Sequence, residues 1–217
     1  MRQIAALFVA TDGCYFGLPG VDPWDVTRDA RKYAGPHPVV AHPPCERWGR
    51  YWSGGPSAKV RRKLGDDDGC FAAAVRAVRE FGGVIEHPEG SHAFERFHIG
   101  RPNWREGWKP ATGFVGWVSC VAQGNYGHRA RKLTWLYAVT PRRPPELDWT
   151  IPAPRSRLDY GFHSAAERRA RRATVAPVVN ATRLDPKGNI ATPIAFRDAL
   201  IAIARTAMIH RLREKIR

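Results

Sequence analysis

Short apolar runs, each closed within a few residues by glycine, proline or charged side chains, recur along the chain. Runs of this length and composition are typical of strands buried in a sheet. Four of them predict strands at residues 4–9, 39–41, 117–121 and 133–139. The second run stops at His42-Pro43-Pro44, because proline has no N–H to give to a strand ladder.

A helical pattern follows a polar and charged stretch, residues 55–68, that we expect to be a loop. Apolar side chains recur at i, i+3, i+4 and i+7 over residues 71–78, with Asp68 as a candidate cap and Gly82 as the end. An apolar pair leading into Glu86 follows at once and predicts another strand. This order of helix, glycine and short strand is typical of an α/β sheet, whose sites lie at the carboxyl ends of its strands.

Two stretches near the beginning and middle of the chain are less regular. Residues 17–25 are rich in turn-forming residues, and residues 26–33 have room for one or two helical turns. The Pro- and Arg-rich segment 140–186 has little periodicity beyond a possible helix at residues 164–173.

The last regular pattern predicts an amphipathic helix over residues 193–213, packed on the core. Its expected apolar face consists of Ile194, Ala195, Leu200, Ile201, Ala204, Met208, Ile209 and Leu212. We therefore expect three parts: an α/β domain over residues 1–139, a small basic segment over 140–186, and a C-terminal part, 187–217, whose helix packs back on the α/β domain.

Composition fits a folded protein of 217 residues, with 43% hydrophobic residues and eight tryptophans. No stretch approaches the roughly 20 apolar residues of a membrane span, and the first apolar run is too short for a signal peptide, so we expect a cytoplasmic protein and no membrane partner. The four cysteines are widely spaced without a CxxC pair, which is not typical of a disulfide framework or a zinc finger.

The net charge of +15 is concentrated towards the end of the chain. Residues 129–217 contain 19 Lys and Arg against 7 Asp and Glu, whereas residues 1–128 contain 16 against 13. Arginine outnumbers lysine 28 to 7, which favours forked contacts with phosphates or bases. The pattern indicates a phosphate-facing surface, with a merely solvated basic face as the alternative.

Cys45 and Glu86 are the candidate catalytic residues of this pattern. Cys45 follows a strand and two prolines, and His42 and nearby arginines are candidates to activate its thiol. Glu86 ends another predicted strand, where an isolated carboxylate is costly to bury. A nucleophile and an acid at neighbouring strand ends form a catalytic pair; the alternatives are a packed thiol and a structural ion pair.

Arg129 and Arg131 alternate just before a predicted strand. This spacing predicts that both side chains lie on one side of the strand entrance. A solvated basic patch is the alternative.

Four segments resemble motifs of the cytosine-C5 DNA methyltransferases. VVAHPPCERWG resembles their Pro-Pro-Cys loop, and GVIEHPEG resembles their Glu-Asn-Val strand end with His87 in place of the Asn. YGHRARKLTWLYAV is similar to their Tyr-Gly and Arg-x-Arg segment, and GNIATPIAFRDALIAIA to their late Gly-Asn motif with its helix. Order and spacing agree over residues 39–139.

The resemblance implies a Rossmann-like methyltransferase sheet with helices on both faces, reduced in size. By the motif match, Cys45 is the nucleophile, Glu86 is the acid that engages the cytosine ring, and Arg129 and Arg131 hold the base. The base is expected to be flipped out of duplex DNA. The further expected substrate contacts are Pro44, Trp48, Gln123, Tyr126 and His128.

The cofactor implied by the resemblance is S-adenosylmethionine, with no metal expected. Its expected contacts are Phe8, Asp12, Gly13, Asp22, Trp24 and Asn189. This half departs from the family, because Ala10 and Asp12 stand where glycines are expected and a Cβ there can block backbone approach. Only about twenty residues separate Asp22 from Pro43, too few for the usual helix, strand and further helix.

Three other interpretations compete with a methyltransferase-like enzyme. One is a DNA-binding protein on a degenerate methyltransferase frame, with an idle thiol. Another is a cytosine-modifying enzyme that uses a different electrophile or a metal held by His42, Cys45, His87 and His92. The third is a nuclease that uses the acidic residues 66–68 with Glu86, although consecutive Asp residues more often cap a helix.

Overall fold

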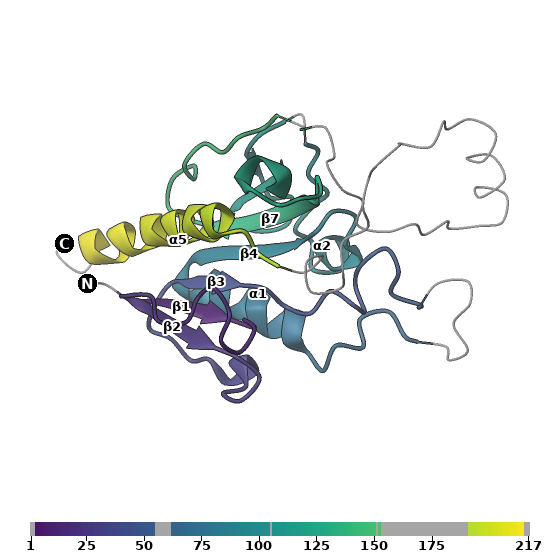
Figure 1. Ribbon diagram of the computed structural model, residues 1–217. Helices are drawn as coiled ribbons and strands as arrows, with labels where there is room; N and C mark the ends of the chain where they lie inside the picture. The colour runs from purple at the N-terminus through teal and green to yellow at the C-terminus, as the bar shows by residue number, and fades with distance from the viewer. Residues whose placement is uncertain (1–2, 55–61, 105, 151, 153–190, 215–217) are drawn as a thin grey trace, which may run out of the picture.

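The computed structural model describes residues 3–54, 62–104, 106–150, 152 and 191–214, with side chains in the last helix described as far as residue 207. The described residues form an α/β structure around one mixed sheet of seven strands in the order β2-β1-β3-β4-β7-β6-β5 (Figure 1). The strands are β1 (Ile4–Leu7), β2 (Val21–Trp24), β3 (Val39–Ala41), β4 (Gly83–Pro88), β5 (Lys109–Pro110), β6 (Trp117–Ala122) and β7 (Leu133–Val139).

The sheet has a parallel half and an antiparallel half. Strands β2, β1, β3 and β4 run parallel, and β7 then pairs antiparallel with both β4 and β6. The chain passes from β1 to β2 on one side and then to β3 on the other. The crevice at such a reversal, beyond the carboxyl ends of the strands, is where open α/β sheets bind their ligands.

A helix covers each face of the sheet. On one face, α1 (Cys70–Phe81) packs through Phe71, Val75 and Val78 against alternate residues of β3 and β4. On the other face lies α5 (Ile194–Glu214), the yellow helix of Figure 1, which packs mainly against β4 and β3. The short helix α2 (His92–Arg96) and two 3-10 turns, η1 (Ala30–Lys32) and η2 (Gln123–Tyr126), complete the elements.

The apolar face of α5 differs from the expected one at its beginning. Leu200, Ile201 and Ala204 are buried as expected, but Ile194 is 64% exposed and Ala195 is also exposed. Phe196, Ile203 and Ala207 are buried instead, which gives the spacing of a helix packed on a sheet. The expected contacts of Met208, Ile209 and Leu212 lie outside the described side chains.

Two further expectations are corrected by the structure. The turn-rich segment contains β2, because an edge strand tolerates Pro23, whose missing N–H costs no ladder bond there. The cap of α1 comes from Asp67 rather than Asp68: the Asp67 carboxylate accepts from the backbone N–H groups of Gly69 and Phe71.

The connection between β2 and β3 contains only the single turn η1, as the shortened spacing predicts. The loop β1–β2, residues 8–20, consists of turns as well. Within the described part of the chain, no helix has the length and apolar character that crossing a bilayer requires. The possible helix at residues 164–173 falls outside the described residues.

Candidate functional site

A hydrogen-bond chain crosses the carboxyl edge of the parallel strands. His42 follows β3 directly, and its Nδ1 lies 3.0 Å from Oε2 of Glu86 near the end of β4. The other ring nitrogen, Nε2, lies 2.8 Å from the hydroxyl of Tyr15 in the β1–β2 loop. Because β3 and β4 are in register, His42 and Glu86 lie on the same face of the sheet, the face covered by α5.

The chain continues into the antiparallel half. Gln123, which is fully buried at the end of β6, donates from Nε2 to Oε1 of Glu86 (3.0 Å) and to Oγ1 of Thr134 on β7 (2.9 Å). Both carboxylate oxygens of Glu86 therefore have a protein partner. A group held this firmly has a defined direction relative to anything bound above the strand ends.

Electrostatics keep Glu86 ionised. Burial raises the pKa of its carboxyl group, but the hydrogen bond and charge of His42, with the charges of Lys132 and His87, outweigh burial and bring the pKa to about 2. His87 points to the opposite face, where its ring packs edge-on against Phe71. Burial lowers the pKa of His87 to about 4, so its ring is neutral at physiological pH.

The loop that presents Cys45 is a single turn anchored in the core. The carbonyl of Cys45 accepts from the backbone N–H groups of Trp48 and Gly49. Trp48 is buried among the rings of Phe71 and Phe97, and its Nε1 donates to Asp67 at 2.7 Å. Trp48 thus holds the loop in place and is not exposed for stacking on a base, contrary to its expected role.

The Cys45 thiol is partly exposed and lies within electrostatic reach of Glu86 and Lys132. Burial raises the pKa of this thiol, the charge of Glu86 raises it further, and the charge of Lys132 lowers it. The thiols of Cys14, Cys70 and Cys120 also have raised pKa values, chiefly through burial. A depressed pKa therefore does not distinguish Cys45; its place beside Glu86 at the carboxyl edge of the parallel strands does.

Lys132, rather than the two predicted arginines, faces the thiol and the carboxylate. Burial lowers the pKa of Lys132, while the charges of Glu86 and Cys45 raise it. Its Nζ donates to the carbonyl of Ala191 at 3.2 Å. The backbone at Lys132 has a positive φ of 41°, directly before β7.

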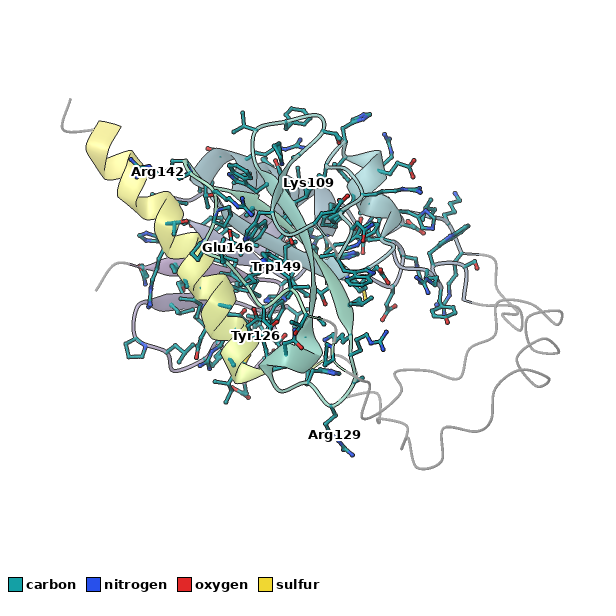
Figure 2. All side chains as sticks on the ribbon, turned by 90° about the horizontal axis from the view of Figure 1, so that it is seen from above. Lys109, Tyr126, Arg129, Arg142, Glu146 and Trp149 are labelled. Atoms are coloured by element: carbon teal, nitrogen blue, oxygen red, sulfur yellow. The ribbon has the colours of Figure 1, made fainter. Side chains whose placement is uncertain are left out.

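Arg129 is exposed at the tip of the loop between β6 and β7 and points away from the body of the protein (Figure 2). Arg131 donates from Nε to the carbonyl of Pro152 at 3.1 Å. Among the described contacts, neither arginine bonds to Glu86 or to the Cys45 loop, and the role of both in holding a base stays a prediction from the resemblance.

The other expected substrate contacts are either residues that pack within the protein or residues exposed at its surface. Pro44 is exposed beside Cys45. Tyr126 packs against Phe196 of α5, and its hydroxyl accepts from the backbone N–H of Asp148 (Figure 2). His128 is buried and bonds through Nδ1 to the backbone of Ala130. Of the expected set, Gln123 alone is bonded to Glu86 among the described residues.

In the expected cofactor region, the acidic residue and the indole are already engaged. Asp22 accepts from Arg28 Nη1 at 2.5 Å and from the indole Nε1 of Trp24 at 2.8 Å. The guanidinium of Arg28 lies 4.1 Å over the ring of Trp24, and Tyr33 packs against the same ring edge-on at 5.3 Å. This arrangement leaves neither the Asp22 carboxylate nor that indole face open to a ribose and an adenine.

The turn after β1 is equally unlike a cofactor loop. Phe8 and Asp12 have positive φ values of 57° and 55°, and Asp12 is exposed. A Cβ at Gly13 would lie 2.8 Å from the carbonyl oxygen of Ala10, so this glycine permits a tight turn of the chain on itself. The remaining expected cofactor contact, Asn189, lies outside the described residues.

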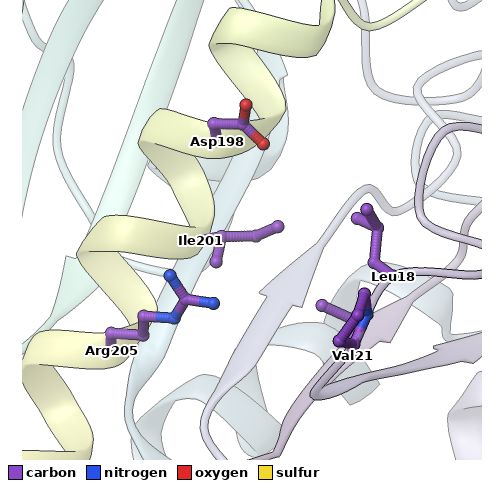
Figure 3. A pocket seen from close by; sticks show the side chains of 6 residues that line it. Leu18, Val21, Asp198, Ile201 and Arg205 are labelled. Carbon is purple, nitrogen blue, oxygen red and sulfur yellow. The ribbon is translucent and has the colours of Figure 1, made fainter.

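Among the described residues, no group of three or more His, Cys, Asp and Glu side chains is arranged to hold a metal ion. His42 is bonded to Tyr15 and Glu86, and His87 lies on the opposite face of the sheet. A depression of about 290 Å³ lies elsewhere, between α5 and the beginning of β2, lined by Leu18, Pro19, Val21, Asp198, Ile201 and Arg205 (Figure 3).

Comparison of the chain with protein-family models, curated proteins and solved structures found no match. Any functional proposal therefore rests on the geometry of the site. Tyr15 and Lys132 were not found by sequence reasoning, since Tyr15 lies 27 residues before His42 and the basic segment before β7 offered three cations. His42 was predicted as a candidate activator of the Cys45 thiol, whereas in the structure it bonds to Glu86.

Proposed function

We propose that this protein modifies cytosine at C5 in DNA through a covalent adduct between Cys45 and C6 of the base. One observation carries the proposal: a partly exposed thiol and a fixed carboxylate lie at the carboxyl ends of adjacent parallel strands, with Lys132 near both. This edge of an α/β sheet is where ligands bind, beside the point at which the strand order reverses.

The chemistry requires these two groups together. C5 of cytosine becomes nucleophilic only when a thiolate adds to C6, and the ring accepts the added electron pair more readily when N3 is hydrogen-bonded or protonated. Cys45 supplies the thiolate and Glu86 faces N3. The raised pKa keeps the thiol protonated at rest, and the charge of Lys132 favours its ionisation during attack.

No comparable observation supports the binding of a methyl donor. The fit of S-adenosylmethionine fails at Asp22 and Trp24, which are bonded to Arg28 and to each other. Methyl transfer therefore stays a prediction from the resemblance. The step that the geometry supports is activation of C5, with exchange of its hydrogen against solvent.

DNA is the proposed partner because of the charge distribution. The excess of 19 basic over 7 acidic residues in positions 129–217 suits a phosphate backbone, and a paired cytosine must be flipped out to reach a thiol. We expect affinity for a short duplex to fall steeply as salt is raised from about 50 to about 200 mM, through counterion release. A flat response would remove the basic segment as the phosphate-binding surface.

The decisive experiment measures adduct formation and C5 exchange. Oligonucleotides with 2-pyrimidinone in place of cytosine take up a thiol at C6 without a methyl donor, and tritium at C5 of normal cytosine reports exchange. We expect Cys45→Ala to abolish both signals, and Cys70→Ala, at another partly exposed thiol, to leave both unchanged. Undiminished adduct with Cys45→Ala would refute the assignment.

Asp22 and Trp24 are both in contact with Arg28, which favours a second candidate function: a DNA-binding protein whose thiol does not react. That protein would bind duplex DNA with the same salt dependence but would release no tritium and form no adduct. Ammonia release from cytosine would instead indicate deamination. Mass spectrometry of nucleosides, with and without S-adenosylmethionine, distinguishes these outcomes from methylation.

A further inference from the structure

We infer that His42 is the positioning residue that supplies Glu86 with the proton it passes to N3 of the base, with Tyr15 fixing the orientation of the imidazole. This inference rests on the proposed function and deepens it. It concerns two residues, His42 and Tyr15, that the resemblance to the methyltransferases does not assign.

The hydrogen bonds fix the direction of the imidazole. Nδ1 of His42 faces the Glu86 carboxylate at 3.0 Å, and Nε2 faces the Tyr15 hydroxyl at 2.8 Å. Burial raises the pKa of Tyr15 well above its usual range, so this hydroxyl stays neutral and holds Nε2 through a hydrogen bond. Nδ1 is the ring nitrogen placed to pass a proton to Glu86.

The surroundings make the pair an electrostatic unit. The charged and titratable groups that act on Glu86 are His42, Lys132 and His87, and Glu86 in turn acts on the Cys45 thiol. His42 and Glu86 are 13% and 12% exposed at their side chains, so solvent is an inefficient proton source for the carboxylate. Both His42 nitrogens are engaged away from the thiol, which excludes a thiol–imidazole pair in this arrangement.

The proton and electron movements balance without an added reactant. The Cys45 thiolate forms the S–C6 bond, the C5=C6 pair moves to C4–C5, and the C4=N3 pair moves onto N3. The proton of the Cys45 thiol goes to water as the thiolate forms and returns from water at the end. The Nδ1 proton of His42 passes to the Glu86 carboxylate and on to N3, which leaves Glu86 an anion again and His42 a neutral imidazole bonded to Tyr15. C5 then gains a solvent proton, loses its original one to water, and the S–C6 bond breaks as N3 returns its proton along the same path.

The first test is the pH profile of C5 tritium exchange in full-length variants. His42→Asn keeps an amide N–H that can donate to Glu86 but cannot carry a proton. His42→Ala loses both the N–H donor and the proton carrier. We expect His42→Asn to lower the rate about a hundredfold, the usual scale of general-acid catalysis, and to change the pH profile of exchange. His98→Asn is the matched control, since His98 is exposed and its φ of 54° suits asparagine. Tyr15→Phe should show a smaller loss. A wild-type rate and profile in His42→Asn overturns the inference.

The second test needs no DNA. With ¹³C-labelled glutamate, the signal missing in Glu86→Gln identifies Glu86. In the wild type we expect it to stay ionised until the pH nears about 2, and in His42→Ala to titrate at clearly higher pH. An unchanged titration overturns the coupling. If the coupling is present but the wild type neither exchanges tritium nor forms an adduct, the proposed function fails and proton delivery to a base fails with it, while the His42–Glu86 pair stands.

Discussion

The two halves of the carboxyl edge treat their polar groups differently. Over β3, β4 and β6, the side chains of His42 and Gln123 both bond to the carboxylate of Glu86, which lies beside a partly exposed thiol. Over β1 and β2, Asp22 and Trp24 are paired with Arg28 on the protein's own surface. In the first half the carboxylate of Glu86 lies beside a partly exposed thiol, whereas in the second half the carboxylate of Asp22 pairs with an exposed arginine.

Under the proposed function, the reactive residues and the expected cofactor residues are separate features, and activation of C5 can be tested without a bound methyl donor. A thiol and an acid suffice to activate a pyrimidine at C5, whereas a bound methyl donor needs a loop that allows close backbone approach. The Ala10–Gly13 turn closes on itself instead. Changes at Glu86, Lys132 and Arg28 test whether the halves are separate in this way.

Removing the carboxylate should affect the reactive half most. Glu86→Gln should lower C5 tritium exchange by about 10²- to 10⁴-fold, because the base loses its acid. The same change should speed alkylation of Cys45 by iodoacetamide at fixed pH, since the anion that raises the thiol pKa is gone. The control is Glu95→Gln, at an exposed carboxylate paired with Arg101. If Glu86→Gln loses both C5 exchange and Cys45 alkylation to the same extent, the variant is merely misfolded.

Acid should destabilise the wild type more than Glu86→Gln. A carboxyl group with a folded pKa of about 2, against an ordinary 4.5, contributes stability above its unfolded pKa and loses it as pH falls through the folded value. This contribution is about 3 kcal/mol, lost between about pH 5 and about pH 2. Urea unfolding at several pH values measures it. If the two proteins lose stability in parallel over that range, Glu86 is not held as an anion.

Lys132→Met should weaken the reactive half by a smaller amount. Without this cation the Cys45 thiol pKa rises, so alkylation of Cys45 and C5 exchange should each slow severalfold. Lys109→Met, at an exposed lysine paired with Glu106, is the matched control. Alkylation that is unchanged or faster in Lys132→Met would show that the lysine does not act on the thiol.

Opening the other half should change the reaction least. Arg28→Ala frees Asp22 and one face of Trp24, yet we expect C5 exchange to change by less than about twofold, the scale of surface ion-pair effects. Calorimetry with S-adenosylmethionine accompanies this measurement. If the wild type binds S-adenosylmethionine tightly and Asp22→Asn does not, then Asp22 releases Arg28 to bind the cofactor. The two halves would then not differ in the way described.

The sequence was sufficient for most elements of the fold. Apolar runs closed by turn residues located β1, β3, β4, β6 and β7, and the i, i+3, i+4 pattern located α1. It failed at β2, since the prolines and glycines of residues 17–25 are typical of turns and only position at the sheet edge makes Pro23 acceptable. Edge position is a tertiary property that no local window contains.

The site was predictable in part for a similar reason. Strand ends identify Cys45 and Glu86 as neighbours, because parallel strands in one sheet share an edge. Which cation acts on them was not predictable, because Arg129, Arg131 and Lys132 lie close together before β7 and the alternating pattern does not distinguish Lys132. Tyr15 reaches the site from a loop whose path depends on long-range packing.

The bond from Arg197 Nη1 to the carbonyl of Cys14 joins residues 183 positions apart, one residue from the tyrosine that orients His42. A ribosome must release the beginning of α5 before that contact can form. During synthesis, the loop that carries Tyr15 therefore gains this contact only after the first residues of α5 have emerged, long after β1 is made.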